Sequence, residues 1–310
     1  MSVAAVDPPF PPPAKRWSLR GDLPWRMLHA GVLGAPWFLE GLYGAFWSGV
    51  IGLCAHQPRR GLAANLAALG ISHPQFRAWL AFRRFGEVAV DGIRSLNDEI
   101  LEWEVEGREH LQSAMDSGLP VVLWTAHMGS YDVAASFFAH RLGTRMHAVR
   151  RPEMNPHLQA IREKSLRRME SDNLVTLYND GREQTLALEL MRVLRDGQWV
   201  ALQADRALPG LSTFDVEADG IVWTLPKGPF VLPIVARAAC LPVFIHRTGP
   251  RRYHVCFHPM VTPPRQRDHK DASEKLARAW LELLVPTVRQ APDQWFVFEQ
   301  VARRATPESA

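Results

Sequence analysis

His127 and Asp132 are the pair of residues in this chain whose types and spacing most directly suggest catalysis. On one continuous helix, a separation of five residues would point their side chains about 140° apart, because each residue rotates the chain by roughly 100°. Gly129 lies between them and permits the backbone angles of a turn. Across such a turn, the carboxylate can hold one imidazole nitrogen and leave the other free as a general base.

The chain offers this base no obvious protein nucleophile. No serine has the G-x-S-x-G surroundings of a nucleophile elbow, and Ser130 is not flanked by the glycines of that motif. A His/Asp pair without a nucleophile suits direct activation of a substrate hydroxyl for attack on an activated acyl group. The alternative is structural: Asp132 would cap a helix beside a buried histidine.

The elements that must position this pair are a strand, a turn and a helix. Pro120 is followed by the apolar run Val121–Trp124, which is typical of a buried strand, and a helix is expected to begin near Ser130. Further strands are expected over residues 103–105, 146–149, 174–177, 199–203, 241–246, 253–258 and 293–298. Helices are expected over residues 156–169, 183–195, 230–239 and 272–290. This alternation predicts an α/β fold with a mixed, largely parallel central sheet flanked by helices, and with residues for chemistry at the strand ends.

At this point the motif resembles a known family. The run from His127 to Asp132 is similar to the H-x-x-x-x-D/E motif of glycerolipid and lysophospholipid acyltransferases, and its surroundings resemble their lipid A biosynthesis (lauroyl/myristoyl) branch. That branch usually has Asn-Trp-Glu where this chain has Ser130-Tyr131-Asp132. The resemblance extends from about Pro58 to Arg304. Its other anchors are Arg59, Arg60, Asn65, Leu66, the run Arg151-Pro-Glu-Met-Asn155, Gly181, Arg182, Asp205 and the run Asp293-Gln-Trp295.

The resemblance implies transfer of a fatty acyl chain from a thioester to a hydroxyl or amine of a lipid or glycolipid, with no cofactor and no covalent enzyme intermediate. It implies substrate-binding roles for Arg151, Asn155, Arg182 and Asp205. Arg182 also precedes a predicted helix, whose N-terminus favours anions such as an acceptor phosphate. Backbone N–H groups near Gly129 are expected to stabilise the oxyanion. Residues 208–220 are expected to form a mobile loop that acts as a lid over the acyl pocket.

The predicted helix over residues 156–169 has a strongly basic side. It follows Arg151 closely, and we interpret its charges as a docking surface for an acidic acyl carrier protein. The expected donor is therefore acyl carrier protein in preference to coenzyme A. The alternative is an ordinary solvated face. The docking residues would be Arg162, Lys164, Arg167 and Arg168.

The formal charge of +4 and the pI of about 9.2 suit an anionic partner such as a membrane surface, an acidic carrier protein or nucleic acid. No motif favours nucleic acid. Three widely spaced cysteines indicate no disulfide framework. His254, Cys256 and His258 are expected to share one strand face, but no fourth residue has the spacing of a metal ligand, so no metal is predicted.

The N-terminal part of the chain divides into two segments. Residues 1–22 are rich in proline, do not read as a signal peptide, and are expected to be a disordered tail, as are residues 305–310. Residues 23–57 are apolar and aromatic, but charge and proline interrupt them, so they should lie on a membrane rather than cross it. The expected lipid-facing aromatics are Trp25, Trp37, Tyr43 and Trp47. The alternative is a helical hairpin packed on the protein's own core.

These observations leave two hypotheses from different classes. The first is an acyltransferase domain over residues 58–304, working as a peripheral protein at the cytoplasmic face of an inner membrane. The second is a catalytically silent protein that uses the same basic face and an apolar tunnel to bind lipid or carrier protein. An enzyme requires the His127 and Asp132 side chains in hydrogen-bond reach of each other and open to a tunnel, whereas a binding protein does not need both.

Overall fold

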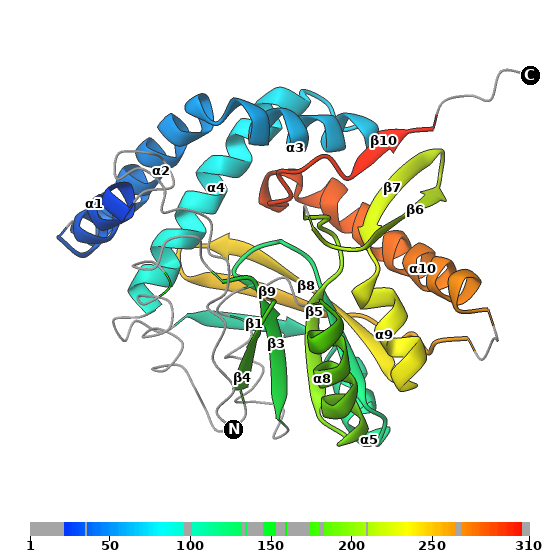
Figure 1. The fold of residues 1–310 in the computed structure, drawn as a ribbon. Helices are drawn as coiled ribbons and strands as arrows, with labels where there is room; N and C mark the ends of the chain where they lie inside the picture. The colour runs from blue at the N-terminus through cyan, green and yellow to red at the C-terminus, as the bar shows by residue number, and fades with distance from the viewer. Residues whose placement is uncertain are drawn as a thin grey trace, which may run out of the picture.

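The computed structural model describes residues 22–34, 36–95, 101–131, 134, 145–152, 159, 174–179, 183–208, 210–264 and 268–305 (Figure 1). Several sequence predictions concern residues outside these ranges. They are Asp132, Asn155, Arg182, the basic helix with its four docking residues, and almost all of the two terminal tails.

A seven-stranded sheet forms the centre of the protein, in the order β1-β9-β8-β2-β5-β3-β4. Every neighbouring pair is parallel except β8 and β9, so the predicted α/β fold with a mixed, largely parallel sheet is confirmed. The strands are β1 (Glu102–Glu106), β2 (Val121–Thr125), β3 (Met146–Arg150), β4 (Leu174–Tyr178), β5 (Trp199–Gln203), β8 (Ala239–Gly249) and β9 (Arg252–Phe257).

The first four residues of strand β2 are apolar and buried, as expected where helices cover both faces of the sheet. Val122 and Trp124 point into a core formed with α8, α9 and α10, while Val121 and Leu123 point into a second core that includes α5. The Trp124 indole N–H donates to the Pro229 carbonyl oxygen over 2.9 Å, so this large side chain is packed and satisfied. These helices are α5 (Arg108–Asp116), α8 (Glu183–Arg195), α9 (Gly228–Ala236) and α10 (His269–Gln290).

A small antiparallel sheet corrects two sequence predictions. Residues 208–220 were expected to be a loop, but β6 (Thr213–Ala218) pairs with β7 (Ile221–Pro226) across a turn in which Asp219 and Gly220 both have positive φ. This Asp-Gly pair is a typical hairpin signal, and the lid prediction was wrong over these residues. The strand expected over 293–298 is also absent. Residues Pro292–Gln294 form a 3-10 turn, and β10 (Ala302–Arg304) pairs with β7 instead.

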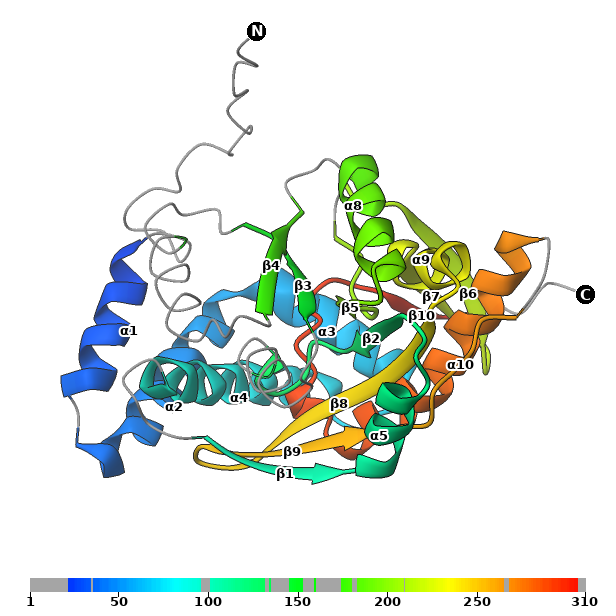
Figure 2. The same cartoon turned by 90° about the horizontal axis from the view of Figure 1, so that it is seen from below.

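In the described part of the chain, four helices precede the sheet. They are α1 (Asp22–Gly34), α2 (Trp37–Cys54), α3 (His56–Ala68) and α4 (Pro74–Ser95). Helix α2 packs along α4 through glycines: a Cβ added at Gly44 would meet the Val90 side chain at 2.8 Å. Figure 2 shows α1 and α2 at the opposite end of the protein from α10. Among the described residues, none of the helices has the length and apolarity that a membrane crossing requires.

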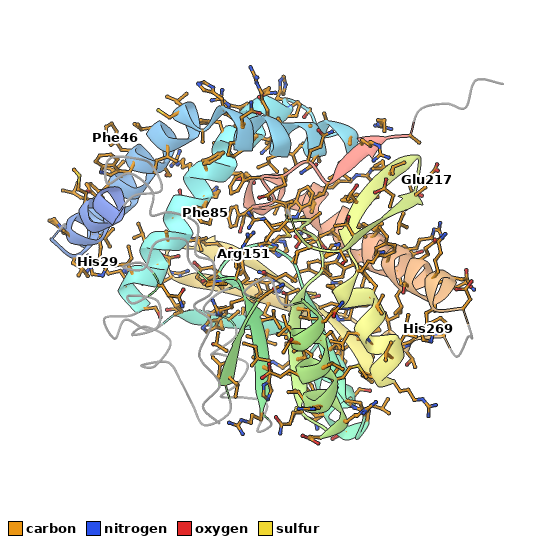
Figure 3. The ribbon with its side chains drawn as sticks, in the orientation of Figure 1. His29, Phe46, Phe85, Arg151, Glu217 and His269 are labelled. Atoms are coloured by element: carbon orange, nitrogen blue, oxygen red, sulfur yellow. The ribbon has the colours of Figure 1, made fainter. Side chains whose placement is uncertain are left out.

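The other face of α2 carries large apolar side chains in solvent. These side chains recur at helical spacing. Figure 3 shows one of them, Phe46, pointing away from the protein. The stripe, called here the α2 stripe, consists of Leu39, Leu42, Phe46, Val50 and Leu53. Tyr43 and Trp47, which the sequence analysis expected to face lipid, are half-buried, and the Tyr43 hydroxyl donates to the Met27 carbonyl oxygen. The side chains of Trp25 and Trp37 lie outside the described residues.

Candidate active site

His127 lies just after β2 and is held by a fully buried carboxylate. Its ring Nδ1 is 2.7 Å from Asp205 Oδ1, and its backbone N–H donates to Asp205 Oδ2 over 2.8 Å. The Trp295 indole N–H donates to the same Oδ2 over 2.9 Å. A neutral imidazole in this arrangement has its proton on Nδ1, which leaves the lone pair of Nε2 available as a base.

The sheet brings His127 and Asp205 together although they are 78 residues apart. Strands β2 and β5 are parallel neighbours, so the residues that follow their carboxyl ends meet at one edge of the sheet. The Ala204 N–H donates to the Thr125 carbonyl oxygen over 3.0 Å, which continues the pairing up to the site. The contact is therefore a direct result of the sheet order.

Gly129 is required by the turn that follows His127. Its φ is +54°, and a Cβ there would lie 2.5 Å from the Ile245 carbonyl oxygen on β8. Any other residue would be strained and would push the turn away from the sheet. The Ala134 N–H donates to the Ser130 carbonyl oxygen over 3.0 Å, as expected for a helix that begins at Ser130.

A second polar pair lies beside the histidine. Arg206 donates from Nε and Nη2 to both oxygens of Glu299, over 2.7 and 2.6 Å. Burial opposes ionisation of Glu299, but the hydrogen bond and charge of Arg206 outweigh it and hold the pKa of that carboxyl below its ordinary value. Tyr131 packs edge-on against the His127 ring, with 5.2 Å between ring centroids. The site thus has a charged rim and an aromatic wall.

The C-terminal segment that supplies Trp295 and Glu299 is clamped by one buried asparagine. The Asn65 amide nitrogen donates to the carbonyl oxygens of Val297 and Glu299, and its oxygen accepts from the N–H groups of Val301 and Ala302. The Phe296 N–H donates to the His127 carbonyl oxygen over 2.8 Å. This segment runs alongside the site because its backbone groups pair with the turn and with Asn65, and so it does not form the sheet strand that was expected there.

The structure brings together three of the residues that the sequence singled out: His127, Gly129 and Asp205. Arg151 is exposed just after β3, the strand beyond β5. Trp295 was noted only as part of the resemblance, and the sequence analysis did not connect it with Asp205. The Arg206–Glu299 pair was missed altogether. Sequence spacing could not have identified Trp295 or Arg206 as site residues, because each contacts its partner only in the folded protein.

The described residues contain no cluster of histidine, cysteine, aspartate and glutamate arranged to hold a metal ion. His254 and Cys256 share one half-exposed face of β9, as predicted. His254 forms a 3.1 Å ion pair with Glu106 on β1, so part of that face has a partner within the sheet.

Comparisons with known proteins show the family to which this chain belongs. The sequence model of the family described as bacterial lipid A biosynthesis acyltransferase matches residues 79–303. The chain belongs to this family.

A phosphatidylinositol mannoside acyltransferase of Mycobacterium tuberculosis, found in two strains, is 29% identical over 142 residues. The match covers 46% of this chain and only 43% of that protein. The crystal structure of a 1-acyl-sn-glycerophosphate acyltransferase from Thermotoga maritima aligns with 85% of this chain and 96% of its own, at 14% identity and a TM-score of 0.39.

Proposed function

We propose that this protein is a membrane-associated acyltransferase that moves a fatty acyl chain from a thioester to a hydroxyl or amine of a lipid or glycolipid. The observation that carries the proposal is the buried His127 ring, held through Nδ1 by Asp205 at the ends of two parallel strands. Membership of the family supports the same chemistry. A protein that only binds lipid or carrier has no need of a histidine paired in this way.

In this mechanism, His127 Nε2 removes the proton from the acceptor hydroxyl while the oxygen attacks the thioester carbonyl carbon. Asp205 stabilises the imidazolium that forms. Backbone N–H groups near Gly129 stabilise the oxyanion of the tetrahedral intermediate. When the intermediate collapses, the C–S bond breaks and the imidazolium returns its proton to the leaving sulfur. No bond forms between the enzyme and the acyl chain.

Asp205 takes over the role that the sequence analysis gave to Asp132. It occupies Nδ1 and is completely buried, with Oδ1 on the ring and Oδ2 accepting from His127 and Trp295, so we assign it to the histidine instead of the substrate. Asp132 lies outside the described residues and remains a prediction from the motif. A carboxylate there would be available to the acceptor or to the turn.

The acceptor is proposed to be a sugar-bearing anionic lipid. The family description names lipid A, and the printed name of the mycobacterial relatives includes phosphatidylinositol mannoside; both are glycolipids that carry phosphate. Arg151, which is exposed just after β3, and Arg182 are proposed to bind the phosphate. Asn155 is proposed to contact the same substrate. The donor is proposed to be acyl carrier protein in preference to coenzyme A, docked on the basic helix.

The membrane surface is proposed to bind at the α2 stripe, at the cytoplasmic face of the inner membrane. Contiguous apolar side chains in solvent mark sites of association with membranes or proteins. A helix of this kind lies in the interface with its apolar face in the acyl boundary. A membrane-bound acceptor and a protein held at the membrane would then meet without the lipid leaving the bilayer.

The test is acyl transfer by purified protein, with palmitoyl carrier protein and palmitoyl-coenzyme A as donors and lipid A precursor and phosphatidylinositol mannoside as acceptors. The His127→Ala variant should lose about 10²–10⁴-fold in turnover. His269→Ala, at an exposed position on α10, is the matched control and should be unaffected. Near-normal turnover by His127→Ala would refute the mechanism. Binding of these lipids without turnover by the wild-type protein would favour the silent binding protein.

A further inference from the structure

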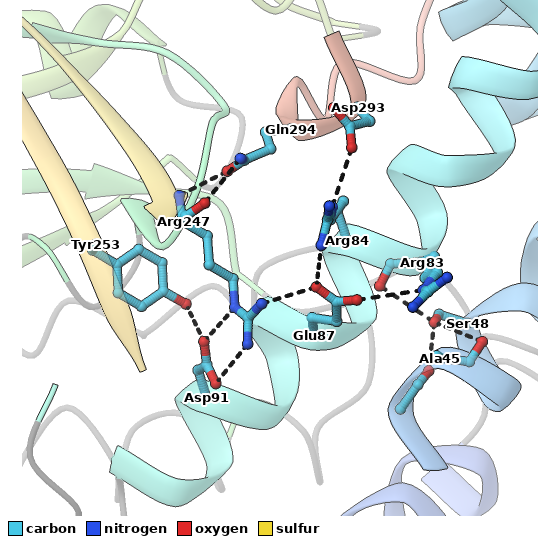
Figure 4. Close-up of polar contacts among 11 residues, drawn as sticks. Ala45, Ser48, Arg83, Arg84, Glu87, Asp91, Arg247, Tyr253, Asp293 and Gln294 are labelled. Carbon is cyan, nitrogen blue, oxygen red and sulfur yellow. Dashed lines mark hydrogen bonds and ion pairs between the residues drawn. The ribbon is translucent and has the colours of Figure 1, made fainter. Parts of the chain in front are cut away.

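A cluster of charged and polar side chains, most of them largely buried, joins α4 to β8 and β9 (Figure 4). Arg247 on β8 donates from Nε to Asp91 over 2.7 Å and from Nη1 to Glu87 over 2.9 Å. Arg84 donates to Glu87 over 2.9 Å and to Asp293 over 3.1 Å. Buried charges are tolerated when they are paired in this way, but apolar residues of similar volume would stabilise the fold at least as well. The cluster therefore calls for an explanation other than stability.

One branch of this cluster reaches the catalytic turn. The Tyr253 hydroxyl donates to Asp91 Oδ2 over 2.7 Å and also has a hydrogen bond with the side chain of Ser130. Burial, followed by the charge of Asp91, raises the pKa of Tyr253 well above its ordinary value, so the phenol keeps its proton. A carboxylate can only accept, so Tyr253 donates to Asp91, and its hydroxyl oxygen is left to accept from Ser130. Ser130, Tyr253 and Asp91 are all buried.

The same cluster also supports the opposite side of the site. The backbone N–H of Arg247 donates to the Gln294 side-chain oxygen over 2.7 Å, and the Gln294 amide donates back to the Arg247 carbonyl oxygen over 3.0 Å. Gln294 precedes Trp295, which donates to Asp205. The turn at His127 is thus held at one end by Asp205 and at the other by Ser130, and Arg247 is linked to both ends.

We propose that Tyr253 and Asp91 are positioning residues for His127: they hold Ser130, and through it the glycine turn that presents the imidazole. This inference rests on the proposed function, because it assumes that His127 is the base. A displacement of about 1 Å can cost about 10²-fold in rate. Loss of one bond to the turn should therefore lower turnover while acceptor and donor affinity stay the same.

The experiment compares Tyr253→Phe with Thr224→Val in the full-length protein. Each change removes one hydroxyl that donates to an aspartate over 2.7 Å, but Thr224 and Asp215 lie in the β6–β7 hairpin. With palmitoyl-coenzyme A as donor and water or phosphatidylinositol mannoside as acceptor, Tyr253→Phe should lower kcat about tenfold with KM unchanged. Thr224→Val should leave both constants unchanged. Equal kcat in the two variants would overturn the inference.

A double-mutant cycle separates positioning from general stabilisation. Ser130→Ala should reproduce the loss seen in Tyr253→Phe, and the double variant should lose no more than either single one, because both act through the same bond. Fully additive losses would overturn the inference. His127→Ala is measured in parallel: if it retains full turnover, the proposed function fails, whereas an inactive His127→Ala with a normal Tyr253→Phe refutes only the positioning role.

Hydrogen exchange tests the proposal without measuring turnover, so it can also be applied to variants of low activity. Hydrogen exchange of the peptide spanning residues 121–131 reports the His127 N–H that Asp205 accepts. Exchange there should be faster in Tyr253→Phe than in Thr224→Val, while the β5 peptide exchanges equally in both. Equal exchange at the turn would contradict the proposal. Faster exchange in every peptide would mean that Tyr253 only stabilises the fold, and would contradict it as well.

Discussion

The active-site turn and the outer face of α2 depart from ordinary burial in opposite directions. At the turn, the Asp205 carboxylate is 0% exposed and His127 is 7% exposed. On α2, Leu42 is 68% exposed and Phe46 is 64% exposed. Buried polar groups and exposed apolar patches are the informative exceptions in a folded protein, whereas a single exposed leucine is ordinary. Each region therefore gives up stability that a conventional placement would provide.

The two exceptions differ in how they are compensated. Asp205 has a partner for each oxygen, so its desolvation is offset inside the protein. The α2 stripe is offset only when something covers it, at about 25 cal/mol per Å² of apolar surface. The difference is that the Asp205 oxygens are satisfied within the protein, while the α2 stripe is uncovered and is proposed to bind a second surface. The predictions below test each side of this comparison, from the largest to the smallest effect on activity and binding, and then on stability.

The largest effect is expected from Asp205→Asn. The amide has the same shape and keeps one acceptor oxygen, but it cannot stabilise the imidazolium, so turnover should fall about 10²–10⁴-fold. Asp215→Asn is the matched control, since Asp215 also accepts two side-chain hydrogen bonds but lies far from the site in the β6–β7 hairpin. Steady-state acyl transfer and thermal unfolding measure both variants. If Asp205→Asn is as active as Asp215→Asn, the carboxylate at the turn is only structural.

Asp205 also shows how far sequence reasoning could reach. The apolar runs at 121–124 and 199–203 predicted two strands, and strand ends were expected to carry the chemistry, so Asp205 was placed on the correct side of the sheet. The identity of the carboxylate on Nδ1 was not predictable. It depends on β2 and β5 being neighbours, which is a matter of sheet order, and on Trp295, 90 residues beyond Asp205.

The next effect concerns α2. Leu42→Ser with Phe46→Ser removes the two most exposed large side chains of the stripe, and burial of each should contribute about 1.5–3 kcal/mol to membrane binding. Binding to phosphatidylglycerol vesicles, measured by sedimentation, should weaken at least about tenfold. Leu188→Ser is the control, because Leu188 on α8 is 60% exposed without such a stripe. If the double variant sediments like the control, the stripe is covered by something other than lipid.

The large apolar side chains that this region exposes differ from those predicted to face lipid. The sequence analysis selected Tyr43 and Trp47, but these are half-buried, and the exposed stripe is aliphatic apart from Phe46. Helix α2 is apolar nearly all the way round, so its sequence does not reveal which side turns toward α4. The glycines decide this, because the close approach of α4 at Gly44 and Gly52 is possible only on their side.

A smaller effect is expected from the basic helix predicted over residues 156–169, which is an ordinary solvated face unless an acidic partner binds it. Arg162→Glu with Arg167→Glu should raise the KM for palmitoyl carrier protein about tenfold at low ionic strength and leave kcat nearly unchanged. Rim charges act mainly on encounter and are screened by salt. Lys270→Glu with Lys275→Glu on α10 is the control for net charge. The same KM in both double variants would make the helix a solvated face.

His246 is a half-buried histidine that lacks the support given to His127. It lies opposite His254 in the β8–β9 pair, and its Nε2 has no hydrogen-bond partner among the described residues. Burial, followed by the charge of His254, lowers its pKa to about 4 from the ordinary 6.5. The unfolded chain therefore binds a proton between these values that the folded protein does not, so this site makes stability fall as pH drops from 6.5 toward 4 and has no effect above that range.

The last predicted effect is on stability instead of activity or binding, and is the removal of this pH dependence. At pH 5, the linkage should cost about 2 kcal/mol of unfolding free energy, since each pKa unit corresponds to about 1.4 kcal/mol. Urea unfolding at pH 7.5 and pH 5 should show that loss in the wild-type protein and in His269→Leu, an exposed control, and should show a smaller one in His246→Leu. Other titrating groups act equally in all three proteins and cancel in the comparison. If His246→Leu loses as much stability as the control, His246 takes up a proton as readily in the folded protein as in the unfolded chain, and this half-buried imidazole needs no carboxylate such as Asp205.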